Sequence, residues 1–269
     1  EFGSHEPFLT SRTLMLITSQ SGETADVLEA MEAGLRKKAR IVSLVNVRES
    51  SIAKKSHHTL YLNVGPEKAV ASTKATTAHI ALHILLAYAA ANRLGEGKQL
   101  LINAEGHVND MLNPRYEEHL KKLAKKLYKV QDIYVLGRGL MYPSALEIAL
   151  KIKEVSYIHA DGMQGGELKH GTLALIEKGT PCIVVVANDQ NKHAILSNAE
   201  EVKARGGYII GISPENAPVF DYYIRVPDAG DAAPIVSIIP GQILAYHLAL
   251  LKKLDPDKPR NLAKSVTVK

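Results

Sequence analysis

Tryptophan is absent from this 269-residue chain, and aromatic residues make up only 5% of it. Aliphatic side chains must therefore build the core, and an apolar content of 46% is enough for one. The single cysteine, Cys182, cannot form an internal disulfide and is interpreted as a small buried hydrophobic residue. There is no run of 18 apolar residues and no recognisable signal peptide, which predicts a cytoplasmic protein without a membrane-spanning helix.

The formal net charge of +5 would suit a nucleic-acid-binding protein. However, the basic pairs lie on expected amphipathic helices or in loops, with no helix-turn-helix, zinc-binding or aromatic-interleaved pattern beside them. We interpret them as a solvated surface that also favours a small anionic substrate, and expect no nucleic-acid partner. The histidines lack the spacing of metal ligands and no dinucleotide or P-loop fingerprint occurs, so neither a metal nor a cofactor is expected.

Strands and helices alternate along the chain in a pattern that occurs twice. Each copy reads as strand, helix, strand, short strand and long apolar helix; the copies cover 14–45, 58–64 and 73–94, then 182–212, 222–226 and 235–254. This order predicts an α/β fold with a doubly wound parallel sheet in each half, and the likeness of the halves indicates duplication. A further strand over 133–136 and its helix to residue 158 have no counterpart before residue 14, so the first half is expected to lack its N-terminal βα unit.

The pattern also predicts boundaries and burial. We expect a first domain over 1–115, a second over 116–254, and a C-terminal tail over 255–269. The run Leu14–Ile17 is typical of a parallel strand covered on both faces. The helix over 73–94 is apolar nearly all round, which predicts that it is buried, and Gly95–Lys98 should end it.

Polar residues follow the first strand where a helix is about to begin. Ser19, Gln20, Ser21, Gly22 and Thr24 offer hydroxyls, an amide and a flexible backbone, which is what a phosphate site at a helix N-terminus requires. An ordinary capped helix, with Ser21 as N-cap and Thr24 in the first turn, explains the same residues equally well.

Three further positions could carry chemistry. Glu147, Lys151 and Glu154 share one face of an otherwise apolar helix, as either a structural ion-pair ladder or an acid–base pair in a dry cleft. His170 follows a glycine-rich loop and is either simply exposed or held for catalysis. Lys264 lies in a tail that could be loose, or could dock and present a Schiff-base nucleophile.

Four segments resemble the isomerase part of the glutamine–fructose-6-phosphate aminotransferases, also called glucosamine-6-phosphate synthases, which is a pair of sugar isomerase (SIS) domains. They come in that family's order and span nearly the whole chain: Ser19–Thr24, Val70–Lys74, Gly166–Gly171 and Pro259–Val268.

The resemblance implies a role for each matching residue. Ser19, Gln20, Ser21 and Thr24 would bind the phosphate of fructose 6-phosphate, and Val70, Ala71 and Ser72 would line the sugar. Lys264 would form a Schiff base with the open-chain ketose, Glu154 would move a proton between C1 and C2 with Lys151 beside it, and His170 would assist ring opening in the partner subunit's site. A homodimer without a cofactor is implied, with a glutaminase domain as the ammonia source.

The chain departs from the family pattern in lacking that glutaminase domain and the first βα unit with its Gly-Thr-Ser loop. These differences leave two other functions open. One is a stand-alone ammonia-dependent deaminase or isomerase acting on a related phosphosugar. The other is a non-catalytic SIS module that binds sugar phosphates, although such a module would need neither Glu154 nor Lys264.

Overall fold

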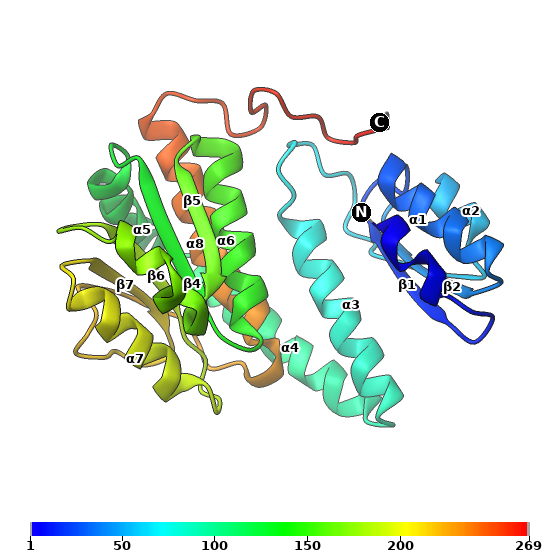
Figure 1. The fold of residues 1–269 in the computed structure, drawn as a ribbon, viewed down its shortest axis with the longest axis horizontal. Helices are drawn as coiled ribbons and strands as arrows, with labels where there is room; N and C mark the ends of the chain where they lie inside the picture. The colour runs from blue at the N-terminus through cyan, green and yellow to red at the C-terminus, as the bar shows by residue number, and fades with distance from the viewer. Residues whose placement is uncertain (1, 268–269) are drawn as a thin grey trace. The chain divides into compact units, whose positions relative to one another are not determined.

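The computed structural model describes residues 2–267, and the chain forms two compact units (Figure 1). The first unit contains the chain up to His83 and again from Arg260 onward, and the second unit is Ile84–Pro259. The C-terminal tail thus belongs with the N-terminal part of the sequence. The domain boundary expected near residue 115 follows the sequence repeat rather than compactness, and it stays a prediction.

The first unit is built on a three-stranded parallel sheet in the order β1-β2-β3, with bounds β1 Leu14–Ser19, β2 Arg40–Val45 and β3 His58–Tyr61. Helices α1 (Ala25–Arg36) and α2 (Ser51–Lys55) follow the first two strands, and a 3-10 helix, η1 (Phe2–Phe8), precedes them. Burial of apolar surface holds α1 on the sheet, because Met31 packs in one cluster with Met15, Ile17 and Ile41.

Strand β1 differs from its expected environment. Its burial alternates along the strand, with Met15 and Ile17 buried while Leu14 and Leu16 are 59% and 48% exposed. The expectation of a strand covered on both faces was wrong. β1 is the edge strand of its sheet, and four consecutive apolar residues do not distinguish one covered face from two.

The second unit contains a five-stranded parallel sheet in the order β5-β4-β6-β7-β8; the strands are β4 Asp132–Gly137, β5 His159–Gln164, β6 Pro181–Val185, β7 Tyr208–Ser213 and β8 Tyr222–Arg225. Helix α7 (Lys192–Lys203) packs its Ile195 and Val202 in one cluster with Leu136 and Cys182. Helices α6 (Met141–Ser156) and α8 (Ala233–Leu251) pack together and contact the sheet (Figure 1). The central strands are therefore buried on both faces, as parallel strands usually are.

The two sheets share the order predicted from the repeat, because β1-β2-β3 matches β6-β7-β8. The doubly wound parallel fold, with a shortened first sheet, is confirmed. Strand β5 was not predicted: its sequence, His-Ala-Asp-Gly-Met-Gln, has no apolar run, and only the backbone pairing from Asp132↔His159 to Gly137↔Gln164 defines it. In the described chain, both β4 and β5 lack counterparts in the first sheet.

The helices that lie between β3 and β4 in the sequence correct two expectations. Helix α3 (Lys74–Ala90) is not buried as predicted, since Ala75 is its only buried residue in the described chain. Helix α4 (Leu94–Met111) runs through Gly95–Lys98, and the break lies earlier, at Asn92, whose φ is +56°. Helix α5 (Pro114–Leu127) begins after Asn113, whose side chain caps it.

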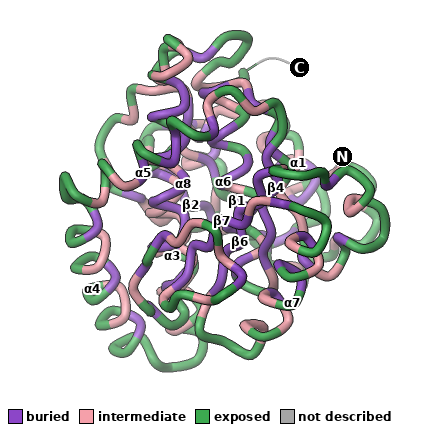
Figure 2. Tube along the Cα trace, turned by 90° about the vertical axis from the view of Figure 1, so that its left-hand side faces the viewer, coloured by how far each residue is buried: buried purple, intermediate pink, exposed green. Residues whose placement is uncertain are grey.

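Helix α8 is apolar all round and lies in the core of the second unit. With the turn before it, Gly230–Leu251 is long and apolar enough to cross a membrane, but 67% of that window is buried inside the protein. Figure 2 shows the contrast between α8, which is largely buried, and α4, which is largely exposed or intermediate. Burial in the core accounts for the hydrophobicity of α8, so this helix is not evidence of a membrane span.

Candidate functional site

The loop between β1 and α1 is held by its own hydroxyls. Ser19 Oγ accepts the amide hydrogen of Gly22 at 3.0 Å and lies 3.4 Å from Thr24 Oγ1. Ser21 Oγ accepts the amide hydrogen of Glu23 at 3.2 Å. The predicted phosphate-binding residues Ser19, Ser21 and Thr24 thus gather at the carboxyl end of a parallel strand, where ligands of open α/β sheets bind.

The backbone conformation of this loop requires glycine at position 22 for two reasons. Its φ is +70°, in the left-handed region, and a Cβ there would lie 2.2 Å from Ser50 Oγ and 2.5 Å from Ser50 Cβ. The one acidic residue of the loop, Glu23, turns its carboxylate away to accept the amide hydrogen of Ser51 at 2.7 Å. That hydrogen bond lowers the pKa of Glu23.

Helix α1 begins one turn later than an N-cap at Ser21 would place it. Thr24 is the N-cap, and its side chain makes no capping hydrogen bond. The C-terminal tail reaches this helix start, since the Ala25 amide donates to Val266 O at 3.0 Å and Ser21 Oγ lies 3.1 Å from Ser265 Oγ. The tail is therefore docked on the candidate phosphate loop.

Lys264 in this tail has a buried partner that the sequence motifs did not include. Its Nζ donates to Glu67 Oε2 at 3.0 Å. The same oxygen accepts the Ser72 hydroxyl at 3.1 Å, and Glu67 Oε1 accepts the amides of Thr73 at 2.8 Å and Ala75 at 3.3 Å. Glu67 thus joins the candidate nucleophile to the segment expected to line the sugar. A carboxylate three residues before Val70 was its only sequence signal.

The protonation of Glu67 follows from these contacts. Burial acts to raise the pKa of its carboxyl, but the hydrogen bonds from Thr73, Lys264 and Ala75 together bring that pKa below its ordinary value. In the described structure Val70 is partly buried and Ala71 is buried, next to Ser72. Gln20, also expected at the phosphate, is partly buried at the end of β1.

The remaining predicted catalytic residues belong to the second unit. Lys151 is buried on α6, with its Nζ 2.6 Å from Glu154 Oε2 and 3.6 Å from Glu147 Oε1. The polar stripe predicted from the spacing therefore exists, and Lys151 lies between two carboxylates. A buried amine requires such partners, so the ion pairs themselves fit a structural and a catalytic role equally well.

His170 ends a short 3-10 helix, η2 (Gly165–His170), and is exposed. Its exposure leaves the imidazole accessible to a substrate or to another subunit. Glu154, Lys151 and His170 thus lie in the second unit, whereas Lys264 and the phosphate loop lie in the first.

In the corresponding loop after β6, polar and charged side chains are paired with one another. Asn188 Nδ2 donates to Asp228 Oδ2 at 3.0 Å, and Lys192 Nζ donates to Asn188 Oδ1 at 2.8 Å and to Glu215 Oε2 at 2.7 Å. Acidic side chains would repel a phosphate here, so the first copy of the repeat is the one suited to an anion.

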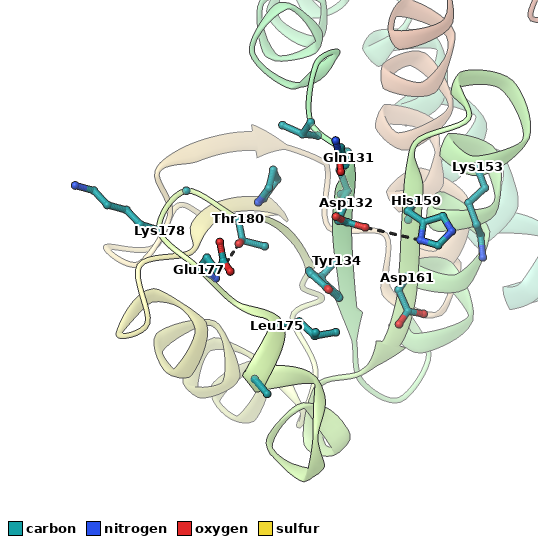
Figure 3. A pocket seen from close by; sticks show the side chains of 16 residues that line it. Gln131, Asp132, Tyr134, Lys153, His159, Asp161, Leu175, Glu177, Lys178 and Thr180 are labelled. Atoms are coloured by element: carbon teal, nitrogen blue, oxygen red, sulfur yellow. Dashed lines mark hydrogen bonds and ion pairs between the residues drawn. The ribbon is translucent and has the colours of Figure 1, made fainter.

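A cavity of about 800 Å³ lies elsewhere in the second unit (Figure 3). It opens at the amino ends of β4, β5 and β6, where Asp132 Oδ1 lies 3.8 Å from His159 Nδ1. None of the predicted site residues lines it. Parallel sheets bind ligands at the carboxyl ends of their strands, whereas this cavity lies at the amino ends. We therefore take the phosphate loop, and not this cavity, as the candidate substrate site.

Comparison with known proteins identifies the family. The model of the SIS domain matches residues 2–89 and 126–252. The chain belongs to the SIS domain family. This SIS chain is 42% identical over 269 residues to the glutamine–fructose-6-phosphate aminotransferase [isomerizing] of Pyrococcus horikoshii, and equally to that of Thermus thermophilus over 281 residues. It spans about half of these curated relatives, 45% and 46% of their lengths.

Solved structures give the same result. The SIS chain is 35% identical to the C-terminal domain of glucosamine-fructose-6-phosphate aminotransferase from Francisella tularensis, with a TM-score of 0.85 over 91% of this chain and 73% of that one. A glucosamine-6-phosphate deaminase from Thermotoga maritima is 25% identical, with a TM-score of 0.80 over 98% and 78%. The resemblance drawn from the four motifs is confirmed.

Proposed function

We propose that this chain is the isomerase part of a glucosamine-6-phosphate synthase, acting on fructose 6-phosphate. The names of the relatives supply the substrate class, and the docking of Lys264 beside the hydroxyl-rich loop supports it most directly. In this proposal Ser19, Gln20, Ser21 and Thr24 hold the phosphate. Val70, Ala71 and Ser72 line the sugar.

The chemistry then divides among the remaining residues. His170 assists ring opening, which exposes the C2 carbonyl. The Lys264 amine attacks C2 and water leaves, giving an iminium ion that acidifies the C1 hydrogens. Glu154 takes a proton from C1 and delivers it to C2, with Lys151 fixing its orientation through the 2.6 Å contact. With ammonia present, ammonia adds at C2 and Lys264 leaves as the free amine before this transfer, so the aldose product carries an amine at C2. Without ammonia, water adds at C2 and Lys264 leaves, and the same proton transfer in the open-chain ketose gives glucose 6-phosphate.

The test is product formation from fructose 6-phosphate with and without an ammonium salt. We expect glucose 6-phosphate without ammonium, glucosamine 6-phosphate with it, and deuterium at the transferred position in D₂O. Glu154→Gln should remove turnover while substrate binding remains, and Glu177→Gln, which changes an exposed glutamate away from the site residues, serves as the control. No sugar product under either condition would refute the proposal.

A deaminase is the second candidate, because a glucosamine-6-phosphate deaminase shares 25% identity and a TM-score of 0.80 with the chain. The two functions use opposite directions of one reaction. Release of ammonia from glucosamine 6-phosphate, without net synthesis at high ammonium concentration, would favour the deaminase. Binding of phosphosugar without turnover in either direction would instead indicate a non-catalytic module.

We also propose a homodimer, with ammonia delivered by a glutaminase domain. The exposed His170 and the incompletely covered apolar helix α3 support a second subunit. Sedimentation velocity should show a dimer, and mixing a His170→Ala chain with a Lys264→Ala chain should restore activity if the histidine acts across subunits. A monomer with full activity would refute this part of the proposal.

A further inference from the structure

Glu67 is hydrogen-bonded more completely than an ordinary surface carboxylate. Its side chain is 4% exposed, and each of its two oxygens accepts two hydrogen bonds. Two of the donors are amides at the start of α3, where the helix dipole also favours negative charge. The other two are Lys264 and Ser72, residues of the proposed catalytic machinery. Such a donor set stabilises the ionised form.

We propose that Glu67 is the positioning residue and permanent counter-ion of Lys264, and that it does not act as a proton-accepting base. This inference rests on the proposed function. A carboxylate that already accepts four hydrogen bonds has little capacity to take a proton, so the proton lost by Lys264 must go elsewhere. Glu67 instead fixes the amine and pairs with its charge.

The charge balance of the reaction fits this role. The Lys264 ammonium loses a proton, the free amine forms a bond to the carbonyl carbon, and the carbonyl oxygen leaves as water. The sum is R–NH₃⁺ plus a ketone giving R–NH⁺=C plus water, with no net gain or loss of protons. One positive charge therefore faces Glu67 before and after the step, and an ionised carboxylate stabilises both forms.

Glu67 also connects this cation to the sugar-lining segment. Thr76 Oγ1 donates to Ser72 Oγ at 3.1 Å, and Ser72 Oγ donates to Glu67 Oε2 at 3.1 Å. A chain of hydrogen bonds thus runs from α3 through Glu67 to the tail. Docking of the tail and the position of Ser72 depend on the same carboxylate.

The experiment is borohydride trapping of fructose 6-phosphate on the full chain, followed by mass spectrometry of the Lys264 peptide. Glu67→Gln keeps the shape but removes the charge, and its trapping rate at saturating substrate should fall on the order of ten- to a hundredfold. The half-saturating substrate concentration should change much less, because the phosphate loop is intact. Glu32→Gln, which removes the partner of Lys55 on the surface of the same unit, should trap at the wild-type rate.

Glu67→Asp serves as a second variant if Glu67→Gln fails to fold. It keeps the charge but is too short to reach all four donors, so its trapping should be slower than wild type and faster than that of a folded Glu67→Gln. Wild-type trapping in the folded variants would overturn the role of Glu67. No adduct on Lys264 in the wild type would instead overturn the proposed function itself.

Discussion

Gly22 and Gly65 both have positive φ, +70° and +67°, but only Gly22 lacks room for a side chain. Gly22→Ala should destabilise the protein by about 3 kcal/mol, since left-handed strain adds to the overlap with Ser50. Gly65→Ala should cost only about 1 kcal/mol, because nothing lies within 4 Å of its added Cβ. Urea unfolding of both variants measures the difference. Equal losses would show that the approach to Ser50 is unimportant.

The carboxyl of Glu67 gives stability a defined pH dependence. Its pKa is below the ordinary 4.5 in the folded protein, so lowering the pH protonates the unfolded chain first. The stabilisation is fully present above pH 4.5 and is lost as the pH falls through the lowered folded value. The difference in unfolding free energy between wild type and Glu67→Gln should therefore stay constant from about pH 8 to 6 and shrink below pH 4.5. Urea titrations at each pH test this, and a constant difference at low pH would contradict it.

Residue types alone predicted the loop hydroxyls, Lys264 and the Glu154–Lys151 pair as candidates. They did not predict Glu67, since nothing local distinguishes it from a solvent-exposed glutamate in a turn. Its partners Lys264 and Thr73 come from distant and neighbouring positions, and only the docked tail brings them together. Long-range contacts of this kind leave no periodic signal in one sequence.

Close helix packing sets the limit on side-chain size between α6 and α8. A Cβ on Gly241 would lie 2.5 Å from Ile148 Cγ1 and 3.1 Å from Ile148 Cβ. Gly241→Ala should therefore destabilise the protein by about 2 kcal/mol despite the better helix propensity of alanine. Gly106, in the interior of α4, has nothing within 4 Å, so Gly106→Ala should stabilise by about 0.5–1 kcal/mol. Thermal unfolding should give shifts of opposite sign; two shifts of the same sign would contradict the packing argument.

Strand β6 protects the only cysteine. Cys182 is fully buried, and burial raises the pKa of its thiol well above the ordinary value. Because the thiolate is the reactive form, the native protein should not react with a thiol reagent such as Ellman's reagent. The native protein should stay unreactive at every pH tested up to about 9. After unfolding in urea, one thiol should react. Rapid labelling of the native chain would show that β6 opens readily.

Elements with a strong period were predicted well, and the exceptions have physical causes. Helix α8 and strand β6 follow their apolar patterns, whereas β5 is defined by backbone pairing to β4 and has a polar, glycine-containing sequence. Helix α3 is apolar all round without being buried. An apolar composition shows that a helix surface would be stabilised by burial. It does not show whether another element of this chain packs against that surface.

At the scale of the whole molecule, the repeat predicted two parallel sheets with matching order. It gave no indication that the first unit is discontinuous in sequence, closing with the chain from Arg260 onward. Among the described residues, that closure includes three contacts: Lys264 with Glu67, Ser265 with Ser21, and Val266 with Ala25. All three attach the tail to the candidate site.

Truncation after Pro259 should therefore affect one unit selectively. Loss of the three contacts should increase hydrogen exchange at Ala25 and at the neighbouring amides of the β1–α1 loop, because Ala25 N then lacks its acceptor. Amides of β4 and β6, which are buried in the second unit, should keep their protection. Exchange measured by mass spectrometry on peptides from both units tests this.

Lys264→Ala in the full chain is the matched control, because it removes the proposed nucleophile and one contact but keeps the other two. It should abolish trapping while leaving the Ala25 amide protected. If truncation leaves the loop as protected as in the full chain, the tail only carries Lys264. If it exposes the loop, the tail also builds the site that holds the substrate, so that deletion of the tail costs phosphosugar affinity and Lys264→Ala does not.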